Sequence, residues 1–154
     1  MALYSSIIQS EPAGVSQKNT TLKLLVQPKT DIPSGAAIEL LLPLTSDVSI
    51  TSEAITTAPL CEFLGLATPK QVECSISSDG STITWITNDN VPAFNAIQVT
   101  LSSGFNNPLS TEPTQTFQMK IYTDSSKTDS LDYQTTDLFL ISEVEALTPD
   151  DSNL

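Results

Sequence analysis

Apolar residues alternate with polar ones along most of this chain, and turn-forming residues separate the alternating stretches. In residues 21–27, the leucines and the valine at even positions share one face. The same pattern recurs in residues 36–42, 72–76, 81–87, 96–102 and 116–123. Successive side chains of a strand point to opposite faces, so this period predicts β-strands that are buried on one face.

The turn residues divide the chain at intervals of about ten residues. Asp31–Gly35 reads as a tight turn, and Asp79-Gly80 reads as a two-residue hairpin turn, because glycine adopts a left-handed conformation without strain. We expect seven to nine short strands and no amphipathic helix longer than a turn or two. The predicted fold is all-β, a two-sheet antiparallel β-sandwich, with a closed barrel as the alternative.

The 154 residues suffice for a single domain. We predict one β-sandwich domain over residues 1–142, in which 131–141 forms one strand or two joined by a bend. Residues 143–154 are acidic and are expected to form a tail or linker. The N-terminus lacks the basic start and apolar run of a signal peptide, and we interpret the chain as a domain of a longer precursor.

Charge and missing residue types exclude several functions. Eighteen acidic residues against six basic ones give a net charge of −12, which opposes nucleic-acid binding. The chain lacks an apolar run of ~18 residues, so direct membrane insertion is not expected. The sequence contains no histidine, which removes nucleophile–histidine triads and the common zinc sites. We therefore predict a non-catalytic protein without a resident cofactor, calcium excepted.

Cys61 and Cys74 are the only two cysteines. An even, minimal number of cysteines in a β domain rich in Ser and Thr predicts one disulfide, and hence an extracellular or cell-surface location. The alternative is a pair of buried free thiols in a cytosolic protein. Two cysteines without histidine do not complete a tetrahedral metal site.

Three further features are candidate sites. Asp124, Asp129 and Asp132 cluster carboxylates in one polar loop and are candidate calcium ligands, although Lys127 sits among them and a solvated hairpin is the alternative. Asn19 begins an Asn-Thr-Thr glycosylation sequon. Trp85 is either a carbohydrate-stacking platform or part of the core, and its alternation with Ile83 favours the core.

Two stretches carry a resemblance to a known family. They are IPSGAAIELLLP at 32–43, and GFNNPLST at 104–111 followed by TFQMKIYT at 116–123, with the two cysteines between them. In this order they resemble the immunoglobulin-like repeat modules of large extracellular proteins of ciliates and related protists. The resemblance spans roughly residues 10 to 140 and implies an immunoglobulin-like sandwich with a structural or adhesive role.

The expected function is that of an extracellular structural or adhesive module of a surface or filament-forming protein. Its partners would be other proteins or neighbouring copies of the same module. One alternative is a recognition domain that binds calcium or a glycan through its end loops. Another is a polymer subunit assembled by strand exchange through the apolar run Leu138–Ile141, which also fits an ordinary central strand.

Overall fold

The computed structural model describes residues 3–11, 14, 18–43, 48–51, 55, 61–64, 70–108, 114–127 and 130–134. Within these residues the chain forms eleven β-strands, all paired antiparallel. They are β1 (Leu3–Glu11), β2 (Thr20–Pro28), β3 (Ala37–Leu41), β4 (Ser49–Ile50), β5 (Cys61–Leu64), β6 (Lys70–Val72), β7 (Cys74–Ile76), β8 (Thr82–Ile86), β9 (Ile97–Asn106), β10 (Gln118–Tyr122) and β11 (Ser130–Gln134).

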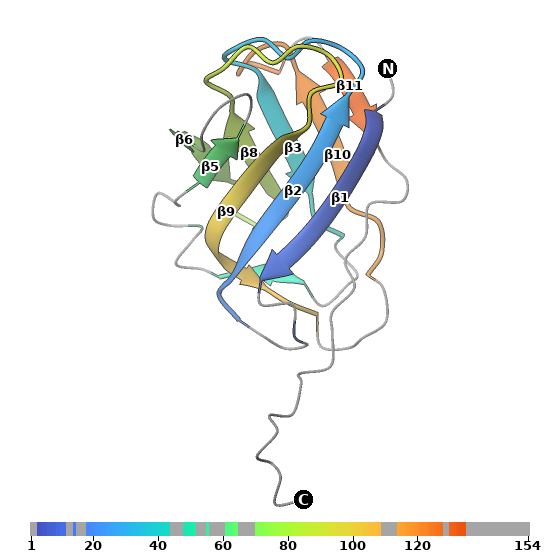
Figure 1. Ribbon diagram of the computed structural model, residues 1–154. Helices are drawn as coiled ribbons and strands as arrows, with labels where there is room; N and C mark the ends of the chain where they lie inside the picture. The colour runs from blue at the N-terminus through green and yellow to red at the C-terminus, as the bar shows by residue number, and fades with distance from the viewer. Residues whose placement is uncertain are drawn as a thin grey trace, which may run out of the picture.

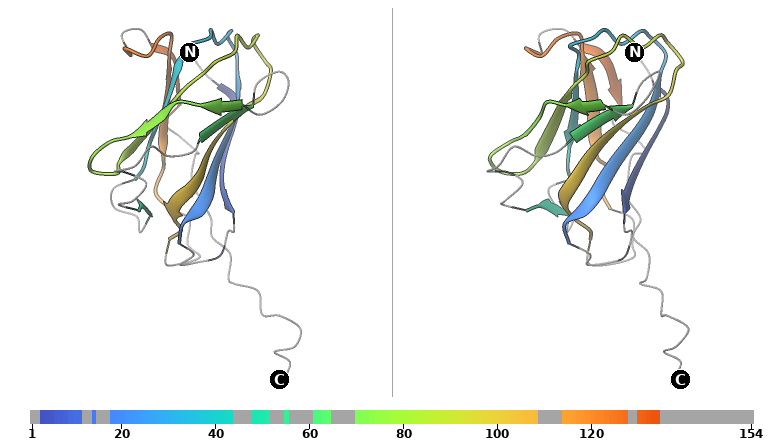
Figure 2. Two further views of the ribbon diagram at one scale, coloured as in Figure 1. Left: turned by 90° about the vertical axis from the view of Figure 1, so that its left-hand side faces the viewer. Right: turned by 60° about the vertical axis from the view of Figure 1, so that its left-hand side comes forward.

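The strands form two sheets packed face to face (Figure 1). One has the order β1-β2-β9-β5-β6, with β4 also paired to β9, and the other has the order β11-β10-β3-β8-β7. Turning the molecule shows the sheets as two layers (Figure 2). The predicted two-sheet antiparallel sandwich is confirmed. The strands outnumber the expected seven to nine because β4, β6 and β7 are pieces of two or three residues.

The core lies between the two layers and follows the predicted alternation. Along β2 every second side chain is buried, beginning at Thr20 and ending at Pro28. The facing sheet contributes Ile38, Leu40, Ile83 and Trp85, all fully buried. Apolar burial of this kind supplies about 25 cal/mol for each Å² removed from water, so these inward faces hold the sheets together.

Residues 72–76, an alternating stretch in the sequence, do not form one strand. Val72 ends β6 in the six-stranded sheet, and Cys74 begins β7 in the five-stranded sheet. The chain crosses between layers at Glu73, whose carbonyl accepts a hydrogen bond from the Ile86 N–H at 2.9 Å. The apolar–polar alternation of residues 72–76 continues across the crossing, because successive side chains still point toward the core and away from it.

Several boundaries differ from those expected. The Asp79-Gly80 hairpin is confirmed, but its connection is longer than two residues, because the Ser77 N–H bonds to the Thr82 carbonyl. Strand β9 runs on to Asn106, and the pattern had not identified β1 or β5. The predicted domain boundary at 142 and the run Leu138–Ile141 lie outside the described residues. Among the described residues, no helix has the length and apolar character needed to cross a membrane.

Candidate functional site

Two loops meet at one end of the sandwich, at the top of Figure 1. Residues 29–36 connect β2 to β3, and residues 87–96 connect β8 to β9. A bridge joins them, because the Ile32 N–H donates to the Val91 carbonyl and the Val91 N–H donates to the Ile32 carbonyl, both at 2.8 Å. Both side chains are buried. The two loops therefore form one connected structure, which we call the tip.

Side chains typical of turns add a second set of bonds to the tip. The Asp31 Oδ1 accepts from the Ala93 N–H at 2.8 Å, and the Asn90 Oδ1 accepts from the Ser34 N–H at 2.8 Å. The Thr87 hydroxyl donates to the Pro33 carbonyl at 2.9 Å. Each loop thus provides hydrogen-bond partners for backbone or side-chain groups of the other loop. The tip is held by polar bonds that do not depend on a ligand.

Among the described residues, Phe94 is the large hydrophobic residue that is exposed, and it lies in the tip. Its side chain is 55% exposed, and its backbone has a φ of 68°, a region that bulky residues rarely adopt. The Phe94 N–H donates to the Pro28 carbonyl at 2.8 Å, and the Gln27 Nε2 donates to the Phe94 carbonyl at 2.6 Å. Such a conformation costs on the order of 1–3 kcal/mol and persists only where its surroundings enforce it. The bonds to β2 supply that enforcement.

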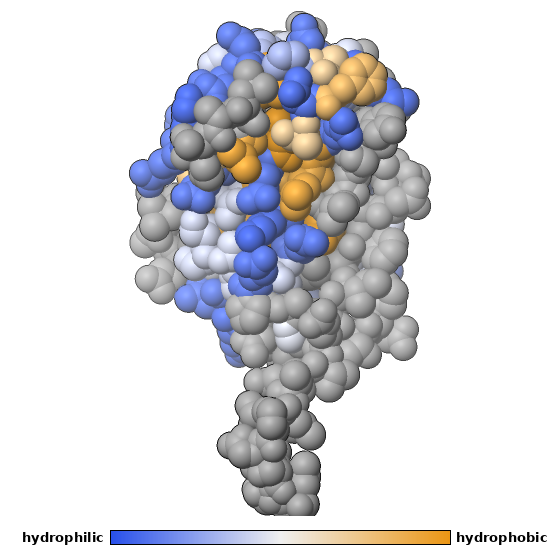
Figure 3. Space-filling view, viewed as in Figure 1, coloured by the Kyte–Doolittle hydropathy of each residue, from blue (hydrophilic) through white to orange (hydrophobic). Residues whose placement is uncertain are grey.

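An apolar area lies on the outer face of the six-stranded sheet, where Leu25 is the next residue along β2 on the same face as Gln27, the residue that bonds to the Phe94 carbonyl. Leu25 and Leu64 both pair with Gln98, so the three side chains share that face across β2, β9 and β5. Both leucines are half-buried. Figure 3 views this face, and hydrophobic residues gather toward its upper end among hydrophilic ones.

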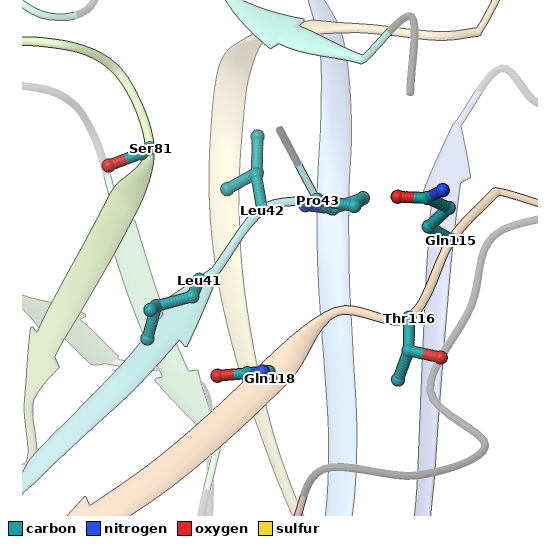
Figure 4. Close-up of a pocket in the computed structure, with 7 residues that line it drawn as sticks. All are labelled: Leu41, Leu42, Pro43, Ser81, Gln115, Thr116 and Gln118. Carbon is teal, nitrogen blue, oxygen red and sulfur yellow. The ribbon is translucent and has the colours of Figure 1, made fainter. Parts of the chain in front are cut away.

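The tip also carries a hollow of about 380 Å³. It is lined by Asp31, Ile32, Pro33, Asn90, Val91 and Pro92. A second hollow of about 300 Å³, shown in Figure 4, lies at the opposite end of β3, where Leu41 pairs with Gln118. Prolines and side-chain amides or carboxylates line both hollows, and neither contains a nucleophile–base pair among its lining residues.

The predicted disulfide between Cys61 and Cys74 is present. Its half-cystines lie on β5 and β7, so it links the two sheets across the core. Cys61 is buried and Cys74 is half-buried. Its position beside the crossing at Glu73 makes it a structural bond at one side of the sandwich.

The structure describes the calcium candidates only in part. The Asp124 Oδ1 accepts from the backbone N–H and the hydroxyl of Ser126, at 3.1 and 2.7 Å. Asp129 and the side chain of Asp132 lie outside the described residues. Among the described residues, His, Cys, Asp and Glu form no group of three that would hold a metal ion. The calcium site stays a prediction.

The structure tests the interpretation of Trp85 but not the glycosylation of Asn19. Asn19 is exposed, with a φ of 60° and its N–H bonded to the Asn106 Oδ1 at 3.1 Å, and its glycosylation stays a prediction. Trp85 is fully buried, which rules it out as an exposed stacking platform. Its Nε1–H donates to the Thr100 carbonyl in the facing sheet at 3.2 Å. The core interpretation of Trp85 is therefore confirmed.

Sequence reasoning missed Phe94. It follows Val91-Pro92-Ala93 in a loop that the pattern treats only as a break between strands. An aromatic residue among turn residues was the available signal, but its exposure depends on bonds to Gln27, distant in the sequence.

Asp79 is the described titratable group whose pKa clearly departs from its ordinary value. Hydrogen bonds from the Ser77 hydroxyl, and then from the hydroxyl and backbone N–H of Ser81, lower its pKa from 3.8 to about 2. This carboxylate organises the β7–β8 turn and faces solvent. Its perturbed pKa therefore reports turn structure.

Comparison with known proteins gives remote structural likenesses. No family model matches the chain, and no curated protein matches it. Several solved structures are similar to it, and three of them are described here. The RrgA Jo.In complex has a TM-score of 0.49 and 8% sequence identity, and the match covers 84% of this chain and 73% of that one. The collagen-binding domain of a Staphylococcus aureus adhesin has a TM-score of 0.39 and 7% identity, and the match covers 93% of each chain. The B domain of a biofilm-associated protein has a TM-score of 0.35 and 14% identity, and the match covers 91% of this chain and 43% of that one. The resemblance to protist repeat modules stays a prediction.

Proposed function

We propose that this protein is an extracellular β-sandwich module with a structural or adhesive role, which contacts a protein partner or a neighbouring copy through its tip. The observation that carries the proposal is Phe94, an exposed aromatic side chain on a backbone held in a left-handed conformation. Residues in strained backbone conformations cluster at functional sites, and they persist only where the surrounding structure maintains the strain.

Phe94 has the properties of a binding anchor. An aromatic ring offers a large contact area and loses little conformational entropy on binding, and such residues dominate the energetics of many interfaces. The bonds from Gln27 and to Pro28 fix the backbone before any partner arrives. A preorganised anchor avoids part of the ordering cost of association.

The half-buried leucines beside the tip extend the proposed contact area. Leu25 and Leu64 would form an apolar margin next to the ring, and polar Gln98 lies between them. Interfaces commonly combine a central aromatic anchor with less energetic contacts that exclude water from it.

The disulfide supports the extracellular part of the proposal. Disulfides form and persist in oxidising compartments and are rare in the cytosol. The absence of histidine from the sequence supports a non-catalytic role. The proposal includes the predicted setting in a surface or filament-forming protein. It also includes the identity of the binding partner, which is either a foreign protein or a second copy of this module. Both parts are tested together with the proposal.

Antibodies raised against the folded domain test the location. We expect them to label intact cells of the source organism without permeabilisation. Labelling that appears only after permeabilisation contradicts the extracellular role.

Coated beads test the contact. Beads carrying the wild type are expected to be retained on intact source cells, or on each other, under flow. Phe94→Asn removes the ring while keeping a residue that tolerates a positive φ, and it should abolish retention. Ser78→Ala, an exposed change in the β7–β8 turn, is the matched control and should adhere like the wild type. Equal retention of the Phe94→Asn beads refutes the role of the tip, and beads that never adhere refute the adhesive function.

A further inference from the structure

A short loop after β10 folds back over the outer face of the five-stranded sheet. The Lys127 N–H donates to the Asp124 carbonyl at 3.2 Å, closing a turn, and Lys127 has a left-handed φ of 59°. Its Nζ then reaches the Glu39 Oε2 on β3 at 2.7 Å and the Thr84 Oγ1 on β8 at 2.9 Å. The loop is therefore fastened across two neighbouring strands.

A hollow of about 420 Å³ lies between this loop and β7. It is lined by Glu73, Cys74, Ser75, Thr84, Ile86, Ser125 and Lys127. Thr84 and Ile86 belong to the outward face of β8 and provide one hydroxyl and one half-buried apolar side chain. The volume falls within the range of about 300–1,000 Å³ that small-ligand sites occupy. We call this hollow the side cleft.

The side cleft retains hydrogen-bonding capacity that the protein does not use. A lysine ammonium has three donors, and the two bonds of Lys127 leave one. Thr84 accepts from Lys127 but keeps its own O–H donor, although it is almost completely buried. Among the described residues, the hydroxyls of Ser75 and Ser125 have no hydrogen-bond partner. Several donors and acceptors thus converge on one small volume.

The charges in the side cleft favour an uncharged ligand. The Lys127 ammonium is already neutralised by Glu39, a contact between two partly buried groups. A free anion would face the carboxylate of Glu73 and a chain of net charge −12. A free cation would lie beside the ammonium. The matching ligand is neutral, offers both donors and acceptors, and has an apolar face for Ile86.

We propose that the side cleft binds a neutral saccharide unit. Sugar hydroxyls both donate and accept hydrogen bonds, and the C–H face of a sugar ring suits the Ile86 side chain. Thr84 and the remaining N–H of Lys127 bind ring hydroxyls at the floor, and Ser75 and Ser125 bind hydroxyls at the two walls. The site lies on a sheet face rather than at the end loops, where the sequence had suggested glycan recognition.

Titration of the isotopically labelled protein with glucose, galactose, mannose and N-acetylglucosamine, one at a time, tests the proposal by NMR. At least one sugar should shift the backbone amide signals of Ser75, Thr84 and Lys127 in a saturable way. Inorganic phosphate and ethanolamine, as anionic and cationic probes, should leave them unmoved. The proposal is overturned if none of the four sugars moves these signals, if the shifts map elsewhere, or if only a charged probe moves them.

Two variants of one strand face isolate the role of Thr84. Thr84→Val keeps the shape but removes the hydroxyl, and it should weaken sugar binding about tenfold or more. Thr82→Val makes the same change two residues away, outside the side cleft, and should bind like the wild type. Equal affinity of both variants refutes the assignment. If Thr84→Val fails to fold, Ser75→Ala combined with Ser125→Ala alters exposed hydroxyls only. This double variant should also weaken binding several-fold, and unchanged binding refutes the assignment.

The side cleft is independent of the tip, since Phe94 does not line it. Phe94→Asn is therefore expected to bind the sugar with unchanged affinity. A failure of the bead experiment leaves this site standing, and a failure of the sugar titration leaves the tip standing.

Discussion

Removing the disulfide between Cys61 and Cys74 should destabilise the protein by about 3 kcal/mol. The bond closes a loop over a sequence separation of 13. In the chain-entropy model, a loop of this length loses about 10 cal/mol/K of entropy in the unfolded chain, which is about 3 kcal/mol at 25 °C. This is a large share of the roughly 5–15 kcal/mol by which domains are stable. The melting temperature should fall by roughly 6–12 °C.

Urea unfolding followed by the fluorescence of Trp85 measures this loss. Trp85 is the only tryptophan and is fully buried, so its emission reports exposure of the core. The double variant Cys61→Ala, Cys74→Ala is compared with the wild type in its oxidised form and after reduction. The reduced wild type keeps both sulfur atoms, so the difference between it and the double variant measures the packing of the two cysteine side chains together, without the crosslink.

The dependence of stability on urea distinguishes the source of the effect. Without the crosslink the unfolded chain expands and exposes more surface, so the slope of the free energy of unfolding against urea should increase. A loss below about 1 kcal/mol, in either the reduced wild type or the double variant, would refute the reasoning. If the oxidised and crosslink-free proteins had equal slopes but a large difference in the free energy of unfolding, the disulfide would act on the folded state instead of the unfolded chain.

Three other outcomes are expected. The pKa of Asp79 is lowered from 3.8 to about 2 in the folded protein, so its contribution to stability is complete above about pH 4 and is lost as the pH falls through 2. Asp79→Asn should therefore be less stable than the wild type at pH 6, and the difference should shrink steadily as the pH falls to 2, as thermal melts would measure. A pH-independent difference would contradict this. Trp85→Phe should cost about 1–3 kcal/mol in urea unfolding, because the Thr100 carbonyl loses its buried donor, and a neutral result would mean that the bond is not formed. If the carboxylates of the 124–132 loop bind calcium, millimolar calcium should raise the melting temperature of the wild type but not of Asp132→Asn; an unchanged wild type rejects the site.

Much of the sandwich follows from local patterns in the sequence. Strands β2, β3, β8 and β10 were predicted because one face of each meets the core and every second residue is apolar. The hairpin at Asp79-Gly80 was predicted because Gly80 needs a positive φ, which is observed at 73°. Each of these signals is contained within a few neighbouring residues.

The remaining features depend on contacts between distant residues. The crossing at Glu73 leaves the alternation intact, so the sequence does not reveal that the chain changes sheets there. Lys127 bonds to Glu39, 88 residues away, and no spacing rule connects them. The exposure of Phe94 likewise depends on Gln27, 67 residues away. The sequence contains the residues of both proposed sites, but it does not indicate which distant residues contact one another in the fold.

The crossing at Glu73 has a consequence for the cooperativity of folding. Strands β6 and β7 are separated by one residue yet complete opposite sheets, and β5 is bonded to β7 through the disulfide. We therefore expect that neither sheet opens at this side while the other stays fully formed. We expect native-state hydrogen exchange to give amides of β5 and β8 a common opening free energy; clearly separate values for the two sheets would contradict this. The two layers would then unfold as one unit.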